Sequence, residues 1–170
     1  MKRTITEITY EQQILRTDPQ RYVEMMSARI AQDPGDASAY FSRHLGWDRL
    51  KRFDLALADL NQTIALEESP IRYLSRGHVW CCLGDHAEAL RDFDRAEALA
   101  PEKWLDYWGP LFQANSHACL GNAREALAAC ARLREDFWSP GLYGTPVGSK
   151  QEIIAEIRRR LARRNRRGGA

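Results

Sequence analysis

Apolar residues three and four positions apart recur along most of the chain, which is the spacing of one face of an α-helix. The clearest case is the segment 70–99, in which two such stripes follow one another. The stripes run through Tyr73, Gly77 and Trp80, and then through Ala89, Phe93, Ala96 and Leu99. Gly84 lies between them, followed by an Asp-x-x-Glu sequence that is typical of a helix start. The pattern predicts two short helices joined by a tight turn.

Helix-start signals predict further helices on both sides of this segment. Residues 5–16 and 19–32 are expected to be helical, with Asp18 capping the second helix. Pro110 is expected to restart a helix after an aromatic insertion, because proline cannot continue one. Asn122 then opens an Asn-x-x-Glu sequence that repeats the capping signal.

A last amphipathic helix is predicted at the end of the chain. Ser149 and Glu152 form a capping box, and Ile153, Ile154, Ile157 and Leu161 follow on one side of the helix. Arginines occupy the other positions. Residues 139–149, with the sequence SPGLYGTPVGS, are rich in glycine and proline and are expected to form a flexible loop.

The sequence also repeats itself. The stretch Tyr40-Phe41-Ser42-Arg43 recurs 33 residues later as Tyr73-Leu74-Ser75-Arg76. The same offset places Trp47 on Trp80, Ala56 on Ala89, Leu60 on Phe93 and Leu66 on Leu99. A weaker third copy comes 37 residues after the second, where 83–90 recurs as 120–127. A single pair of short helices cannot bury its apolar face alone, so neighbouring pairs are expected to stack.

These repeats resemble the tetratricopeptide repeat (TPR) family. The second copy matches its pattern best, with Tyr73, Gly77, Trp80, Gly84, Asp85, Ala89, Phe93, Ala96 and Pro101. In the first copy, His44 stands where the family has a small residue, and Thr63 stands where it has alanine. The resemblance covers residues 36–140 and implies an all-α, right-handed solenoid of helical hairpins with a C-terminal capping helix.

We therefore expect one domain made of five consecutive parts. A degenerate N-terminal helix pair would occupy 1–35. Three TPR-like repeats would follow at 36–69, 70–103 and 104–140, the last with an insertion. A basic capping helix with its tail would occupy 149–170.

The composition supports a globular protein. The 170 residues are 44% hydrophobic and 28% charged, with a mean hydropathy of −0.53, which argues against membrane-spanning, collagen-like and disordered chains. The N-terminus is basic but has no apolar stretch behind it, so no secretory signal is expected. The four cysteines form no Cys-x-x-Cys pair, which favours free thiols in a reducing compartment. We expect a cytoplasmic protein.

No familiar catalytic or phosphate-binding motif is present in the sequence. The nearest approach to one is His78 with Cys81 and Cys82, because residues three and four apart share a helix face. These three could form a metal or thiol site, although small cysteines packed between helices are the commoner case. We expect no catalytic residue, metal or cofactor.

The resemblance implies a partner-binding groove. In the TPR family the first helices of each pair line a concave surface that holds a peptide or helix of another protein. The corresponding residues here are Phe41, Leu45, Arg49, Leu74, His78, Trp108, Leu111, Phe112 and Asn115. The implied function is a non-enzymatic adaptor or chaperone-like scaffold. Two alternatives stay open, in which the C-terminal helix fills this groove or a second copy covers it in a homodimer.

The basic charge is concentrated in the last predicted helix, whereas the rest of the chain is mildly acidic. The arginines concerned are Arg158, Arg159, Arg160, Arg163, Arg164, Arg166 and Arg167. They could bind nucleic acid or an anionic membrane surface, which is the alternative function. No aromatic residues alternate with them, so nucleic-acid binding would not distinguish sequences and would weaken with salt. A solvated end of the solenoid would account for the same residues.

Overall fold

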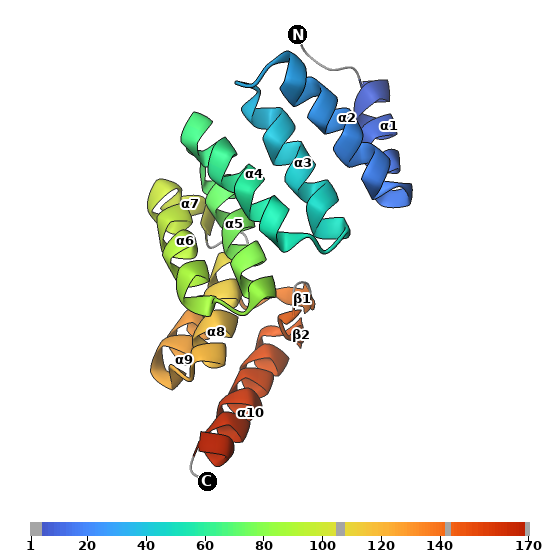
Figure 1. Ribbon diagram of the computed structural model, residues 1–170. Helices are drawn as coiled ribbons and strands as arrows, with labels where there is room; N and C mark the ends of the chain where they lie inside the picture. The colour runs from blue at the N-terminus through green and yellow to red at the C-terminus, as the bar shows by residue number, and fades with distance from the viewer. Residues whose placement is uncertain (1–4, 105–107, 142–143, 169–170) are drawn as a thin grey trace. The chain divides into compact units, whose positions relative to one another are not determined.

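The computed structural model describes residues 5–104, 108–141 and 144–168, and these are almost entirely helical, as predicted (Figure 1). The described helices are α1 (Ile5–Thr17), α2 (Pro19–Gln32), α3 (Ala37–Arg49), α4 (Phe53–Leu66), α5 (Pro70–Leu83), α6 (His86–Leu99), α7 (Pro101–Trp104), α8 (Gly109–Leu120), α9 (Ala123–Ala131) and α10 (Lys150–Gly168). Two short strands, β1 (Trp138–Pro140) and β2 (Val147–Ser149), precede α10. Among the described helices, none has both the length and the apolar character needed to cross a membrane.

The chain divides into two compact units, Met1–Arg72 and Tyr73–Ala170, so the boundary falls inside α5. The first unit contains α1 to α4, and the second contains most of α5 and everything after it. Each unit has a core of its own. In the first, Ile14, Tyr22 and Met26 form a buried cluster between α1 and α2.

Aspartate side chains cap the starts of α2 and α3 in the first unit. Asp18 accepts a hydrogen bond from the backbone N–H of Arg21 at 3.0 Å, which confirms the predicted start of α2.

The two residues that depart from the TPR pattern are both buried. His44 is 3% exposed, and Thr63 donates a hydrogen bond to the Ala37 carbonyl at 2.9 Å, which ties α4 to α3. The larger side chains are therefore accommodated inside the helix pair.

In the second unit, the turn between α5 and α6 forms as predicted. The Asp85 carboxylate accepts from the N–H of Glu88 at 3.2 Å and caps α6. Pro110 lies in the first turn of α8, in agreement with the predicted restart. Asn122 is the N-cap residue of α9, as predicted, but its side chain does not make the predicted capping hydrogen bond. Its amide nitrogen instead lies 3.5 Å from Nδ1 of His117.

The segment 139–149 is predicted to be a flexible loop, but its described residues include two paired strands; residues 142 and 143 lie outside the described residues. β1 and β2 pair antiparallel there, with Ser139 opposite Gly148 and Pro140 opposite Val147. Ser139 is fully buried and Gly148 is also buried, so this face of the ribbon points into the protein. Backbone groups that are removed from water need partners, and strand pairing supplies them here. Pro140 and Gly148 are therefore strand residues here, although proline and glycine are typical of loops.

The last helix packs by its apolar side, as predicted. Ile153 and Ile157 are fully buried and join Leu111 of α8 and Cys130 of α9 in one hydrophobic cluster, consistent with α10 lying beside these helices in Figure 1. The predicted capping box is present, with the Ser149 N–H donating to Glu152 Oε2 at 2.7 Å. α10 is thus an integral part of the second unit.

Candidate functional site

The most regular feature of the structure is an ion pair that recurs with the sequence repeat. Arg43 of α3 forms two hydrogen bonds to Asp59 of α4, at 2.9 and 2.6 Å. Arg76 of α5 forms the same two bonds to Asp92 of α6, at 2.8 and 2.7 Å. Arg43 also lies over the ring of Tyr40, and Arg76 over that of Tyr73, at 5.5 and 5.4 Å from the ring centroids. Two helix pairs are therefore held together by identical side-chain contacts, 33 residues apart.

The repeated ion pair is a structural contact that joins the two helices of each pair. The two aspartate side chains are 4% and 6% exposed, and the hydrogen bonds to them raise the pKa of both arginines. The repeated stretch of four residues that is evident in the sequence contains the tyrosine and the arginine of this contact but not the aspartate. The signal was present, because Asp59 and Asp92 are also 33 residues apart.

The third repeat lacks the ion pair. Moving 37 residues on from Arg76 and Asp92 leads to Gln113 and Ala129. The Gln113 amide instead donates to Asp94 and Glu97 of α6, at 3.0 and 3.1 Å. This polar contact therefore connects neighbouring helix pairs within the second unit. In the first two repeats, by contrast, the ion pair connects the two helices of one pair.

In the first unit, three of the expected groove residues lie along α3. Phe41 is half-buried, with its ring centroid 4.7 Å from that of His44. Leu45 is 37% exposed, and Arg49 is exposed. Together they form a partly uncovered apolar strip with a cationic end, which we call the α3 strip (Phe41, Leu45 and Arg49).

In the second unit, the expected groove aromatics come together as part of a core. Phe112 is 4% exposed and stacks near Phe93, and the His78 ring packs edge-on against Phe112 at 3.9 Å between centroids. Trp108 and Leu74 are half-buried against this cluster. Phe112 therefore cannot line an open surface, whereas Leu74, His78 and Trp108 are partly accessible.

The remaining two groove residues are covered by α10. Leu111 is fully buried against Ile153 and Ile157, and Asn115 accepts a hydrogen bond from Arg160 at 2.8 Å. For these two positions, the C-terminal helix occupies the expected groove surface. Leu111 and Asn115 are therefore not accessible to a partner in this structure, because the apolar side of α10 packs on this surface.

Repeat spacing relates the covered and the open positions. Phe41, Leu74 and Leu111 occupy one repeat position, and Leu45, His78 and Asn115 occupy the next helical turn of the same face. On α8 this face receives an amphipathic helix of the chain itself. On α3 the same face leaves Leu45 exposed to solvent.

The structure places the expected cysteine and histidine positions in different surroundings. The Cys81 sulfur lies 3.4 Å from the Ser116 hydroxyl, and burial raises the pKa of the Cys81 thiol to about 11. A thiol with this pKa is protonated at neutral pH and is a weak nucleophile. Cys82 is exposed, and His78 packs in the aromatic cluster. Within the described ranges, no group of three or more His, Cys, Asp or Glu side chains could hold a metal ion.

The C-terminal arginines divide into two groups. Arg160 and Arg164 form hydrogen bonds to other parts of the second unit. Arg160 also donates to the Gly144 carbonyl at 3.0 Å, and Arg164 donates to the Cys119 carbonyl at 2.7 Å. The side chains of Arg158, Arg159, Arg163 and Arg166 are exposed, and Arg159 pairs with Glu156 at 3.2 Å. The side chain of Arg167 lies outside the described residues.

Two surfaces therefore stand out in the described part of the chain: the α3 strip in the first unit, and the basic outer side of α10 in the second. In neither surface do the described residues bring together a nucleophile, a base and an orienting group. Neither the comparison with protein-family models nor the one with curated proteins finds a match for this chain.

Proposed function

We propose that the protein is a non-enzymatic protein–protein interaction module, an adaptor or scaffold built from TPR-like helix pairs. It holds a helix or peptide of another protein against the first helices of its repeats. The observation that carries this proposal is the relation between α8 and α3. The face that binds α10 on α8 is repeated on α3, where Leu45 is 37% exposed.

The contact between α10 and α8 indicates what kind of segment the α3 strip binds. α10 presents Ile153, Ile157 and Leu161 at four-residue intervals, which is one stripe of an amphipathic helix. On α3, Leu45 replaces Asn115, so a partner helix meets an apolar side chain where α10 offers Arg160. We therefore propose a partner helix with an uninterrupted apolar stripe. Its affinity comes from burial at about 25 cal/mol per Å², reduced by the entropy lost on binding.

A charge placed within the α3 strip tests this proposal. We expect Leu45→Glu to abolish capture of a partner protein from nuclease-treated lysate, because a charged side chain in an apolar contact surface loses its hydration when the partner binds. Leu66→Glu is the matched control, since Leu66 is a similarly exposed leucine on α4, with 41% of its surface accessible. A photo-crosslinking amino acid at position 45 identifies the bound segment, and circular dichroism confirms that both variants fold.

The result that contradicts the proposal is equally specific. If Leu45→Glu and Leu66→Glu retain the same partners, or if position 45 crosslinks to nothing, the α3 strip is not a binding surface. Crosslinking of position 45 only to a second copy of the chain would make the strip a homodimer contact and would also overturn the adaptor function.

A further inference from the structure

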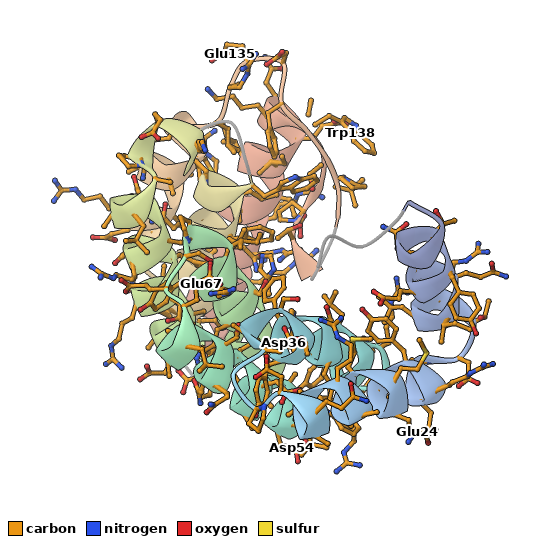
Figure 2. All side chains as sticks on the ribbon, turned by 90° about the horizontal axis from the view of Figure 1, so that it is seen from above. Glu24, Asp36, Asp54, Glu67, Glu135 and Trp138 are labelled. Atoms are coloured by element: carbon orange, nitrogen blue, oxygen red, sulfur yellow. The ribbon has the colours of Figure 1, made fainter. Side chains whose placement is uncertain are left out.

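The β1–β2 hairpin exposes an apolar face. Trp138 is 59% exposed and Val147 is 61% exposed, more than any other large apolar side chain in the described residues. Pro140, opposite Val147 in the register, is exposed as well. Figure 2 shows the Trp138 side chain projecting outward from the ribbon. We call these three residues the hairpin face (Trp138, Pro140 and Val147).

A cationic stripe runs along α10. Arg159, Arg163 and Arg166 follow one another at intervals of four and three residues and therefore share one side of the helix. All three are exposed. The apolar side of α10, with Ile153, Ile157 and Leu161, is buried against α8 and α9, so this arginine stripe lies on the outer side. Glu156 is the nearest acidic residue, and its hydrogen bond to Arg160 is the largest cause of its lowered pKa.

The hairpin face and the arginine stripe lie on the same flank of α10. A Cβ atom added to Gly148 would lie only 2.5 Å from Oε2 of Glu152 and 3.0 Å from its Cβ, so the inner side of β2 rests on Glu152. The three arginines of the stripe follow Glu152 at i+7, i+11 and i+14. At 3.6 residues per turn, each lies within about 40° of Glu152 around the helix. Ser149, which is opposite Trp138 in the register, donates to Glu152 Oε2 at 2.8 Å, so the Trp138 end of the hairpin adjoins the side of α10 that carries the stripe.

We propose that the hairpin face and the arginine stripe together form a docking surface for an anionic phospholipid bilayer. Trp138 and Val147 enter the interfacial layer of the bilayer, and Arg159, Arg163 and Arg166 lie at the level of the phosphate groups. Tryptophan favours this interface because its ring is apolar and its indole N–H can donate a hydrogen bond. Arginines near an anionic surface add electrostatic attraction, which decays within a Debye length.

The apolar half of the surface favours a bilayer over nucleic acid. A nucleic-acid backbone would explain the arginines, but it would gain nothing from an exposed valine and proline beside them. A bilayer uses both halves, because it offers an apolar layer directly beneath its charged headgroups. This surface is separate from the α3 strip, so the inference stands or falls independently of the proposed function.

Vesicle co-flotation of the full chain tests the proposal. We expect binding to vesicles that contain phosphatidylserine and none to pure phosphatidylcholine vesicles. Replacing Arg159, Arg163 and Arg166 with Gln should weaken binding on the order of a hundredfold, from roughly a factor of five for each charge. Replacing Trp138 and Val147 with Ser should weaken it by about tenfold or more, because their apolar area no longer enters the bilayer.

Matched controls separate this surface from a general effect of charge or of apolar area. Arg16, Arg91 and Arg124 are exposed on other helices, so their triple Gln variant removes the same charge elsewhere. Ile71→Ser and Leu83→Ser remove exposed apolar residues, 53% and 49% accessible, from outside the hairpin. Both controls should bind the anionic vesicles as the unaltered protein does.

A third variant locates the tryptophan in the bilayer. Trp138→Leu keeps an apolar side chain and should still bind, but quenching of the protein's fluorescence by brominated acyl chains should fall sharply. Three outcomes overturn the proposal: no flotation with either vesicle, equal loss in the control and stripe variants, or tight duplex binding that the Ser variant of Trp138 and Val147 leaves unchanged. The last would make the stripe a nucleic-acid site.

Discussion

His44 makes the stability of the first unit sensitive to acid. Burial lowers its pKa to about 4, and its Nδ1 has no hydrogen-bond partner among the described residues. Between about pH 6.5 and 4 the unfolded chain therefore binds a proton that the folded chain does not. Stability should be complete above this window and should fall as the pH is lowered through it, by about 2–3 kcal/mol at pH ~4.5.

Urea unfolding at neutral pH and at about pH 4.5 measures this loss. Carboxylates also titrate in this range, so the comparison is with His44→Gln, a neutral side chain of similar size. The variant should lose distinctly less stability on acidification than the unaltered protein. Equal losses in the two proteins would mean that His44 is not the acid-sensitive group.

Gly77 is required by the close packing of α5 on α6. A Cβ atom there would lie 2.4 Å from the buried ring of Phe93. Gly77→Ala should therefore destabilise the second unit by about 1–3 kcal/mol, although alanine is the better helix former. Gly35→Ala is the control, because its nearest contact is the exposed Asp33 side chain at 3.3 Å. Thermal unfolding that ranks the two variants in the opposite order would contradict this account.

At the scale of helix pairs, the repeated ion pair should behave as a unit. Asp92→Ala removes both hydrogen bonds of this pair from the Arg76 guanidinium and should cost about 2 kcal/mol or more. Replacing both residues, as in Arg76→Met with Asp92→Leu, should cost much less, because no charge is left unpaired. The exposed pair of Arg134 and Asp136 should contribute far less, because water screens the attraction between two solvent-exposed charges. Double-mutant cycles with urea unfolding measure the coupling energy of each ion pair. Equal coupling energies would contradict the expected difference between the buried and the exposed pair.

The sequence predicts the helices well because their signals are local. The caps at Asp18 and Asp85, and the box at Ser149, lie within three residues of the groups they bind. The hairpin was missed because strands of three residues are too short to show an alternating pattern, and their glycines and prolines indicate a loop.

The candidate groove was predicted less well because burial depends on distant contacts. Leu111 and Asn115 occupy the same repeat positions as Phe41 and Leu45, so local sequence cannot distinguish covered from open faces. What separates them is α10, whose Arg160 reaches Asn115 across 45 residues of sequence. The apolar side of α10 was evident in the sequence, but the surface on which it packs was not.

At the scale of the whole molecule, two compact units with separate cores imply two separable responses to core mutations. Ile157 is fully buried among α8, α9 and α10, so Ile157→Ala should cost about 2–5 kcal/mol. Met26 is 1% exposed between α1 and α2, and Met26→Ala should cost a similar amount.

Native-state hydrogen exchange distinguishes where each loss is felt. We expect Ile157→Ala to lower protection in α8, α9 and α10 and to leave α2 and α3 nearly unchanged, with the reverse for Met26→Ala. If either substitution lowers protection uniformly from α2 to α10, the chain unfolds as a single cooperative unit. The two compact units would then not unfold independently. If the responses stay local, a partner bound to the α3 strip stabilises the first unit selectively, because ligand binding raises the stability only of the structure that binds it.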